Sequence, residues 1–85
     1  MSATEAAKIA KGLTEAQRRM MLKVRDWPSD DHMVTTLAAL NRHTFRALFR
    51  RRLLSSFRAQ MIDCALFTPL GQRVRAYLTG ASDNA

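Results

Sequence analysis

The residues of this chain that could do chemistry are arginines gathered between positions 42 and 58. This stretch contains six arginines and no Asp or Glu. It does not resemble a disordered basic tail, because large apolar residues interrupt the charges: Phe45, Leu48, Phe49, Leu53, Leu54 and Phe57. A helix over residues 43–51 would stack Arg42, Arg46 and Arg50 along one side and turn Phe45 and Leu48 away from it. Such a helix, anchored by its apolar side, suits a phosphate-bearing groove.

The positive charge of the whole chain is concentrated in its second half. Residues 1–41 carry six Lys or Arg and five Asp or Glu, whereas residues 42–85 carry eight arginines, no lysine and two aspartates. Guanidinium groups bind phosphates and guanine edges in a bidentate manner, while ammonium groups act as point charges. A genome rich in G and C would also raise the arginine content, but it explains the clustering less well.

Length and composition limit the classes of protein to consider. With 85 residues, 47% of them hydrophobic, the chain fits one small domain whose stability is a few kcal/mol. A lone cysteine, Cys64, excludes an intramolecular disulfide, and no apolar run reaches the roughly 20 residues of a membrane span. The N-terminus is not typical of a signal peptide, so we expect a cytoplasmic protein.

Two helices are expected before residue 28. Ser2 to Glu5 has the spacing of a capping box, and an alanine-rich helix over residues 3–11 would end at Gly12. Thr14 to Gln17 is a second capping box, followed by Ala16, Met20, Val24 and Trp27 at helical spacing. Pro28 then ends this helix, and Asp30 or Asp31 could cap the next one, as could Thr35 or Thr36 equally well.

The segment that must position the arginines is predicted to be a helix-turn-helix over residues 34–53. Leu37 and Leu40 would bury one side of its first helix, and Phe45 and Leu48 one side of its second. The turn would be Asn41-Arg42-His43, with Thr44 as a candidate cap.

The C-terminal part contains one open question and one clear helix. Residues 55–67 could form a hairpin, with strands near 53–57 and 65–68, or a helix that starts at Ser56. Thr68-Pro69 predicts the start of a helix that continues to about residue 79, and Gly80 its end. Residues 81–85 are expected to be a flexible tail.

Three segments, taken together, resemble the small winged helix-turn-helix domains of bacteria and phages. Leu13 to Arg18 is similar to the opening helix of that family, Thr44 to Leu54 to the recognition helix and the first wing strand, and Leu66 to Gly71 to the last wing strand and closing helix. The resemblance implies a mainly α fold of three to four core helices with a small β-hairpin wing. The domain would span residues 13–80, preceded by a short helix or arm over residues 1–12.

The resemblance also implies a mode of binding, in which the second motif helix enters the DNA major groove and the wing lies beside the backbone. Carried over by position, the DNA-binding residues are Arg42, His43, Arg46, Ala47, Arg50, Arg51 and Arg58, the last of them toward the wing tip. Two departures are notable. Arg52 stands where the family usually has a glycine, often with a positive φ, and the wing lacks a glycine-rich tip.

Other residues have more ordinary interpretations. Phe49 lies close to the arginine side of its helix and could complete the core, pack on the wing or contact a second subunit; we favour the core. Trp27 is expected to pack under the loop that follows it. Cys64 is expected to be buried, and the core is also expected to contain Met20, Met21, Met33 and Met61. His43 and His32 have no partners at metal-ligand spacing, and no nucleophile has a base beside it, so we expect no metal, no cofactor and no catalysis.

The sequence therefore predicts a sequence-specific binder of double-stranded DNA, of the size of a phage or mobile-element transcription regulator, acting as a homodimer. The helices over residues 3–11 and 69–79 offer surfaces for a second subunit. An alternative is a small interaction module or inhibitor that directs the same basic face at an acidic protein surface. A third possibility, a basic segment lying on anionic membranes, ranks last because the arginine helix is short.

Overall fold

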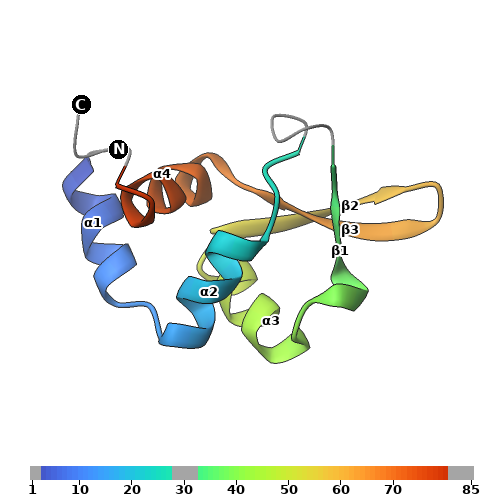
Figure 1. The fold of residues 1–85 in the computed structure, drawn as a ribbon, viewed down its shortest axis with the longest axis horizontal. Coiled ribbons are helices and arrows are strands. Elements are labelled where there is room, and N and C mark those ends of the chain that lie inside the picture. The colour runs from blue at the N-terminus through green and yellow to red at the C-terminus, as the bar shows by residue number, and fades with distance from the viewer. Residues whose placement is uncertain (1–2, 28–32, 81–85) are drawn as a thin grey trace.

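The described residues of the chain, 3–27 and 33–80 of a computed structural model, form four α-helices and a three-stranded antiparallel sheet (Figure 1). In chain order the elements are α1 (Ala3–Lys11), α2 (Glu15–Lys23), β1 (Thr35–Thr36), the 3₁₀ turn η1 (Leu37–Ala39), α3 (Arg42–Arg50), β2 (Leu54–Ala59), β3 (Ile62–Phe67) and α4 (Pro69–Leu78). The strand order is β1-β3-β2. The sheet is thus larger than the small hairpin that the sequence predicted.

Helices α1, α2 and α4 begin or end at the predicted signals. The Thr14 hydroxyl accepts from the Gln17 N–H at 3.1 Å while the Gln17 side chain accepts from the Thr14 N–H at 3.0 Å, which completes the capping box of α2. Pro69 follows the Thr68 cap of α4, whose hydroxyl accepts from the Gly71 N–H at 3.0 Å. Gly80, just beyond α4, has a φ of 81°. Capping and glycine rules therefore locate these ends correctly.

The prediction that α2 continues to Trp27 is wrong. The helix ends at Lys23, and Val24 is already extended, with φ −66° and ψ 133°. Val24 is fully buried all the same, and Trp27 stacks on Phe57 of β2 with ring centroids 5.0 Å apart. Of the four residues at helical spacing, Met20 and Val24 are therefore buried, whereas Ala16 and Trp27 are exposed.

The prediction that the helix-turn-helix begins with a helix after residue 34 is also wrong. Residues 34–40 contain β1, which pairs Thr35 with Ala65 and Thr36 with Cys64, followed by the single turn η1. Two adjacent β-branched threonines favour the extended chain at a sheet edge. Leu40 is buried as expected, but it lies on extended backbone beyond η1.

Helix α3 begins earlier than predicted. Asn41 is its cap, since the Asn41 side-chain oxygen accepts from the Thr44 N–H at 3.1 Å. Asn is among the best N-cap residues, and it outcompetes the predicted Thr44, whose own hydroxyl donates to the same Asn41 oxygen at 3.3 Å. Arg42 and His43 consequently lie in the first turn of the helix rather than in a loop.

Residues 55–67 form the hairpin and not the alternative helix. Strands β2 and β3 pair from Leu54 with Phe67 to Ala59 with Ile62, which leaves a two-residue turn of Gln60 and Met61. Both turn residues have positive φ, 49° and 68°, as a type I′ turn requires. The turn forms with long side chains where Asn-Gly is usual, which explains why no turn signal was visible in the sequence.

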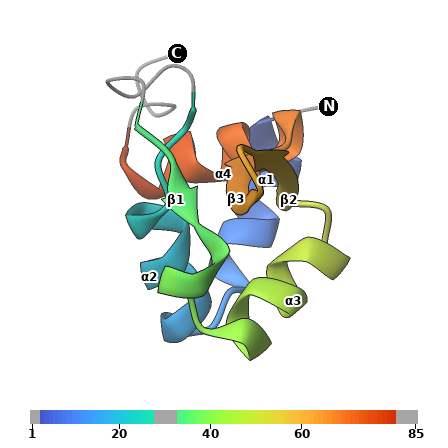
Figure 2. The same cartoon turned by 90° about the vertical axis from the view of Figure 1, so that its right-hand side faces the viewer.

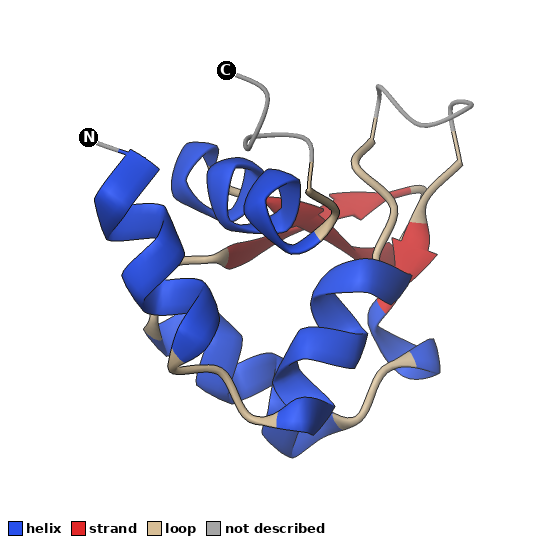
Figure 3. Cartoon of the chain, turned by 60° about the vertical axis from the view of Figure 1, so that its left-hand side comes forward, coloured by secondary structure: helices blue, strands red, loops and turns tan. Residues whose placement is uncertain are grey.

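The core lies where the helices pack around the base of the sheet (Figure 3). Ala6 and Ala10 of α1 join it, and α1 packs along α4, so the inner faces of both terminal helices are already occupied. Met20, Met21 and Cys64 are buried as predicted. Met33 and Met61 are not: they are 54% and 84% exposed, the latter because it lies in the hairpin turn. The predicted roles of Ser2, Asp30, Asp31, His32 and the tail over residues 81–85 lie outside the described residues.

Candidate nucleic-acid interface

Helix α3 is held to the core by one side only. Leu48 is completely buried, and Phe45 packs against the core from a half-buried position. The helix lies next to β2 and packs against α2 (Figure 2). The opposite side of α3 is therefore free to contact a partner.

That free side carries the predicted row of arginines. Arg42, Arg46 and Arg50 are all exposed, at the i, i+4 spacing that places them one above the other. None of the three forms a hydrogen bond or an ion pair with any residue that the structure describes. Their guanidinium groups retain all of their donors for an external acceptor.

The remaining predicted residues of α3 fall into two groups. His43 and Arg51 are exposed, whereas Ala47 is half-buried and contributes little more than a methyl group at the edge of the arginine row. Arg51 caps the C-terminal end of the helix. The structure thus places every residue predicted from positions 42–51 on one short helix and its cap.

The C-terminal end of α3 is closed by a Schellman motif. The Arg52 N–H donates to the Phe49 carbonyl and the Leu53 N–H to the Leu48 carbonyl, both at 3.0 Å. Arg52 has a φ of 62°, as the family resemblance implied for this position. The Arg52 carbonyl accepts from the Thr68 hydroxyl, so the turn after α3 is tied to the start of α4. Leu53 and Leu48, whose backbones are joined by the second of these hydrogen bonds, both have fully buried side chains.

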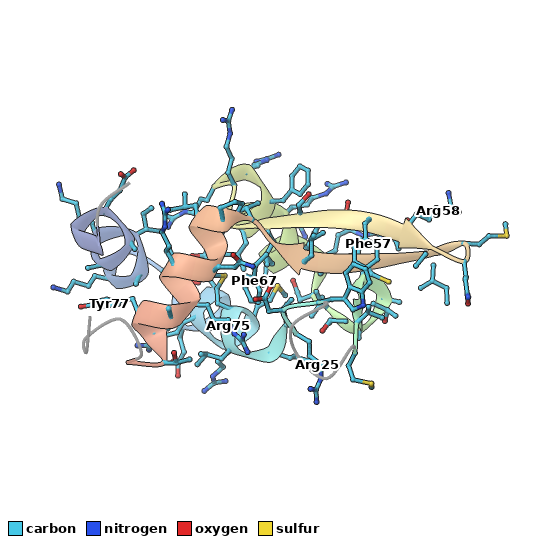
Figure 4. All side chains as sticks on the ribbon, turned by 90° about the horizontal axis from the view of Figure 1, so that it is seen from above. Arg25, Phe57, Arg58, Phe67, Arg75 and Tyr77 are labelled. Atoms are coloured by element: carbon cyan, nitrogen blue, oxygen red, sulfur yellow. The ribbon has the colours of Figure 1, made fainter. Side chains whose placement is uncertain are left out.

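Arg58 lies apart from the arginine row, on β2 near the hairpin turn. Its side chain and that of Phe57 point to opposite sides of the hairpin, and Phe57 faces Trp27 (Figure 4). The Arg58 Nε lies 3.9 Å from a carboxylate oxygen of Asp63, its direct partner across the hairpin, and both side chains are largely exposed. Such a pair is weak, because water competes for both groups.

Two hollows flank α3. One, of about 530 Å³, lies between the N-terminal half of α3, η1 and β3, and it is lined by Leu37, Ala38, Leu40, Arg42, Phe45, Arg46 and Asp63. The second, of about 460 Å³, lies at the other end of α3 and is lined by Phe49, Arg50, Arg52, Leu54, Ser55 and Thr68. Phe49 is 48% exposed, with its ring tilted against Phe45 at 5.9 Å, so the expectation that it completes the core is wrong.

Asp63 is the residue that sequence reasoning missed. It is the only carboxylate among residues 33–80, and it lines the first hollow together with Arg42 and Arg46. The sequence shows that Asp63 is isolated among arginines, but only the register of the hairpin reveals that it meets the arginine helix.

Three further observations concern other kinds of site. Within residues 3–27 and 33–80, no three His, Cys, Asp or Glu residues gather as a metal would need. Over the same residues, none of the helices has both the length and the apolar character to cross a bilayer. Comparison with known protein families, with curated proteins and with solved structures found no match.

Proposed function

We propose that this chain is a winged-helix-like domain, with the single turn η1 in place of the first motif helix, and that it binds double-stranded DNA in a sequence-specific manner with α3 in the major groove. The β2–β3 hairpin is the wing, and α4 is the closing helix. The observation that carries the proposal is the exposed row of Arg42, Arg46 and Arg50, which no carboxylate of the described residues neutralises.

The dimensions of α3 suit this role. Nine helical residues span about 13 Å, and a helix about 10 Å across fits a major groove about 12 Å wide. From there arginines reach both phosphates and the O6 and N7 atoms of guanine. Arg46, in the middle of the row, is assigned to base readout. Arg42, Arg50, Arg51 and Arg58 supply contacts with the backbone, and His43 and Ala47 line the approach to the bases.

A role in transcription is part of the proposal. A regulator of phage or mobile-element size gains affinity by binding as a homodimer to a palindromic site, with half-sites about 34 Å apart. The inner faces of α1 and α4 are packed together, so a second subunit would have to use their outer faces.

The test is in vitro selection of a preferred duplex, followed by binding of two matched variants. Arg46→Ala should lose about 1–3 kcal/mol of binding free energy on the selected duplex and relax the preference for one base position. Arg73→Ala removes an arginine of α4 that is also exposed and should change little. Equal losses in the two variants would contradict base readout by α3.

A second candidate function is favoured by the hollow beside Phe49. A half-exposed aromatic ring in a hollow that Arg50 and Arg52 also line would suit an acidic protein segment, because aromatic residues and arginine are enriched at protein interfaces. If the wild-type chain binds no duplex even at low salt, this candidate replaces the first.

A further inference from the structure

Asp63 stands in contrast to its surroundings. Residues 33–80 contain eight arginines, and Asp63 is their only acidic residue. Its place is also specific, because it lines the hollow that Arg42 and Arg46 of α3 share with β3. A carboxylate at this point opposes the phosphate binding that the surrounding arginines favour.

The ion pair across the hairpin does not satisfy the Asp63 carboxylate fully. Its partner across the strands is Arg58, but the closest approach is 3.9 Å and both side chains are more than 60% exposed. At that distance and exposure the carboxylate retains free acceptor sites, and its residue lines an open hollow where a ligand could lie.

We infer that Asp63 is a specificity-determining residue, which lowers the affinity of the α3–hairpin surface for phosphates and accepts a hydrogen bond from a base amino group. The inference rests on the proposed DNA-binding function. Phosphates are the same in every sequence, so a carboxylate that repels them weakens binding to all duplexes alike. The penalty is offset only where a base offers a donor, and in the major groove the N4 amino group of cytosine is the usual partner of Asp.

The inference predicts that the preferred duplex contains a cytosine whose recognition depends on Asp63. Replacing the carboxylate by the isosteric amide removes the repulsion, and it also exchanges a strong acceptor for a group that donates as well as accepts. Sequence-independent affinity should therefore rise while the preference for cytosine falls.

The experiment compares the wild type, Asp63→Asn and Glu15→Gln on two probes, a random-sequence duplex and the duplex selected by the wild type. Glu15 is the matched control, because it is an exposed carboxylate paired with Arg19 on α2, away from the hollow. We expect Asp63→Asn to bind the random duplex about two- to fivefold more tightly than the wild type. The ratio of selected to random affinity should fall by more than that factor, and Glu15→Gln should leave the ratio unchanged.

The outcomes separate this inference from the function on which it rests. If the wild type binds and Asp63→Asn keeps the same ratio, while its thermal unfolding shows that it is folded, Asp63 only supports the hairpin and the inference is overturned. Unchanged selection of the cytosine by Asp63→Asn would overturn it equally. A wild type that binds neither probe overturns the proposed function itself, together with the inference.

Discussion

Helices α2 and α3 have the same length and are both capped at the N-terminus, but three of the four charged residues of α2 have a partner within the fold, whereas the arginines of α3 have none among the described residues. In α2, Arg19 pairs with Glu15 at 3.0 Å, and the Lys23 ammonium donates to the Ala39 carbonyl at 3.3 Å. In α3, the three arginines form no such bond with any described residue. The content of basic residues therefore does not identify a binding surface. The difference lies in whether the fold itself satisfies the charges.

The two helices also end differently. After α2 the chain simply becomes extended at Val24, whereas the end of α3 is fixed by the Schellman motif and by the hydrogen bond from Thr68 to Arg52. A helix that contacts a rigid partner gains from a fixed orientation, because less freedom is lost on binding. Under the proposed function, the fixed orientation of α3 and its free arginines would both favour binding.

The largest expected effect comes from disrupting the contact between the turn after α3 and the start of α4. A Cβ at Gly71 would lie 2.8 Å from the Leu53 carbonyl carbon and still closer to its oxygen, directly after the α3 turn. Because both sides of this contact are backbone, Gly71→Ala should cost about 3 kcal/mol or more, most of the stability of so small a domain. Urea unfolding, followed by circular dichroism, measures this loss in the free energy of unfolding.

Gly12→Ala is the matched control for this prediction. A Cβ there would meet only the Ile9 and Lys8 carbonyl oxygens at an ordinary 3.6 Å, so the variant should stay folded. Equal stability of the two alanine variants would show that the contact between α4 and the end of α3 is not tight.

A smaller effect tests the turn itself. Arg52 adopts a left-handed conformation that costs a residue with a side chain about 1 kcal/mol, so Arg52→Gly should raise the free energy of unfolding by up to about 1 kcal/mol. Its neighbour Arg51 has φ −79°, where glycine brings only added chain entropy, and Arg51→Gly should lower stability by about 0.5–1 kcal/mol. Urea unfolding of both variants checks the opposite signs, and a loss of stability in Arg52→Gly would contradict the structure of the turn.

Local signals predicted much of this structure. Capping residues gave the starts of α2 and α4, and the amphipathic helix predicted over residues 43–51 gave the buried Leu48 and the exposed arginines. The predictions that failed for β1 and for the surroundings of α3 concern residues whose structure depends on pairing between distant segments. Thr35 and Thr36 form a strand because β3 is available to pair with them, and only that sheet brings Asp63 to the arginine helix.

The exposure of Phe49 and of two methionines, Met33 and Met61, could not be predicted for a related reason. Apolar residues at helical spacing are usually buried, but Phe49 lies at the edge of the apolar side of α3 and is 48% exposed. Met61 occupies a turn position that the sequence gave no reason to expect. Only the fold shows that the exposed Phe49 lines a hollow together with Arg50 and Arg52.

The salt dependence of binding to a random-sequence duplex tests the central claim most directly, namely that the α3 arginines are free to bind a polyanion. Fluorescence anisotropy would compare the wild type with Arg42→Ala/Arg46→Ala/Arg50→Ala and with the α2 variant Arg18→Ala/Arg19→Ala. We predict a steep fall of affinity with salt for the wild type and the α2 variant, and a slope of log affinity against log salt that is shallower by about 3 for the α3 variant, roughly 1 for each arginine. A flat response of the wild type, or equal slopes for all three proteins, would contradict the account.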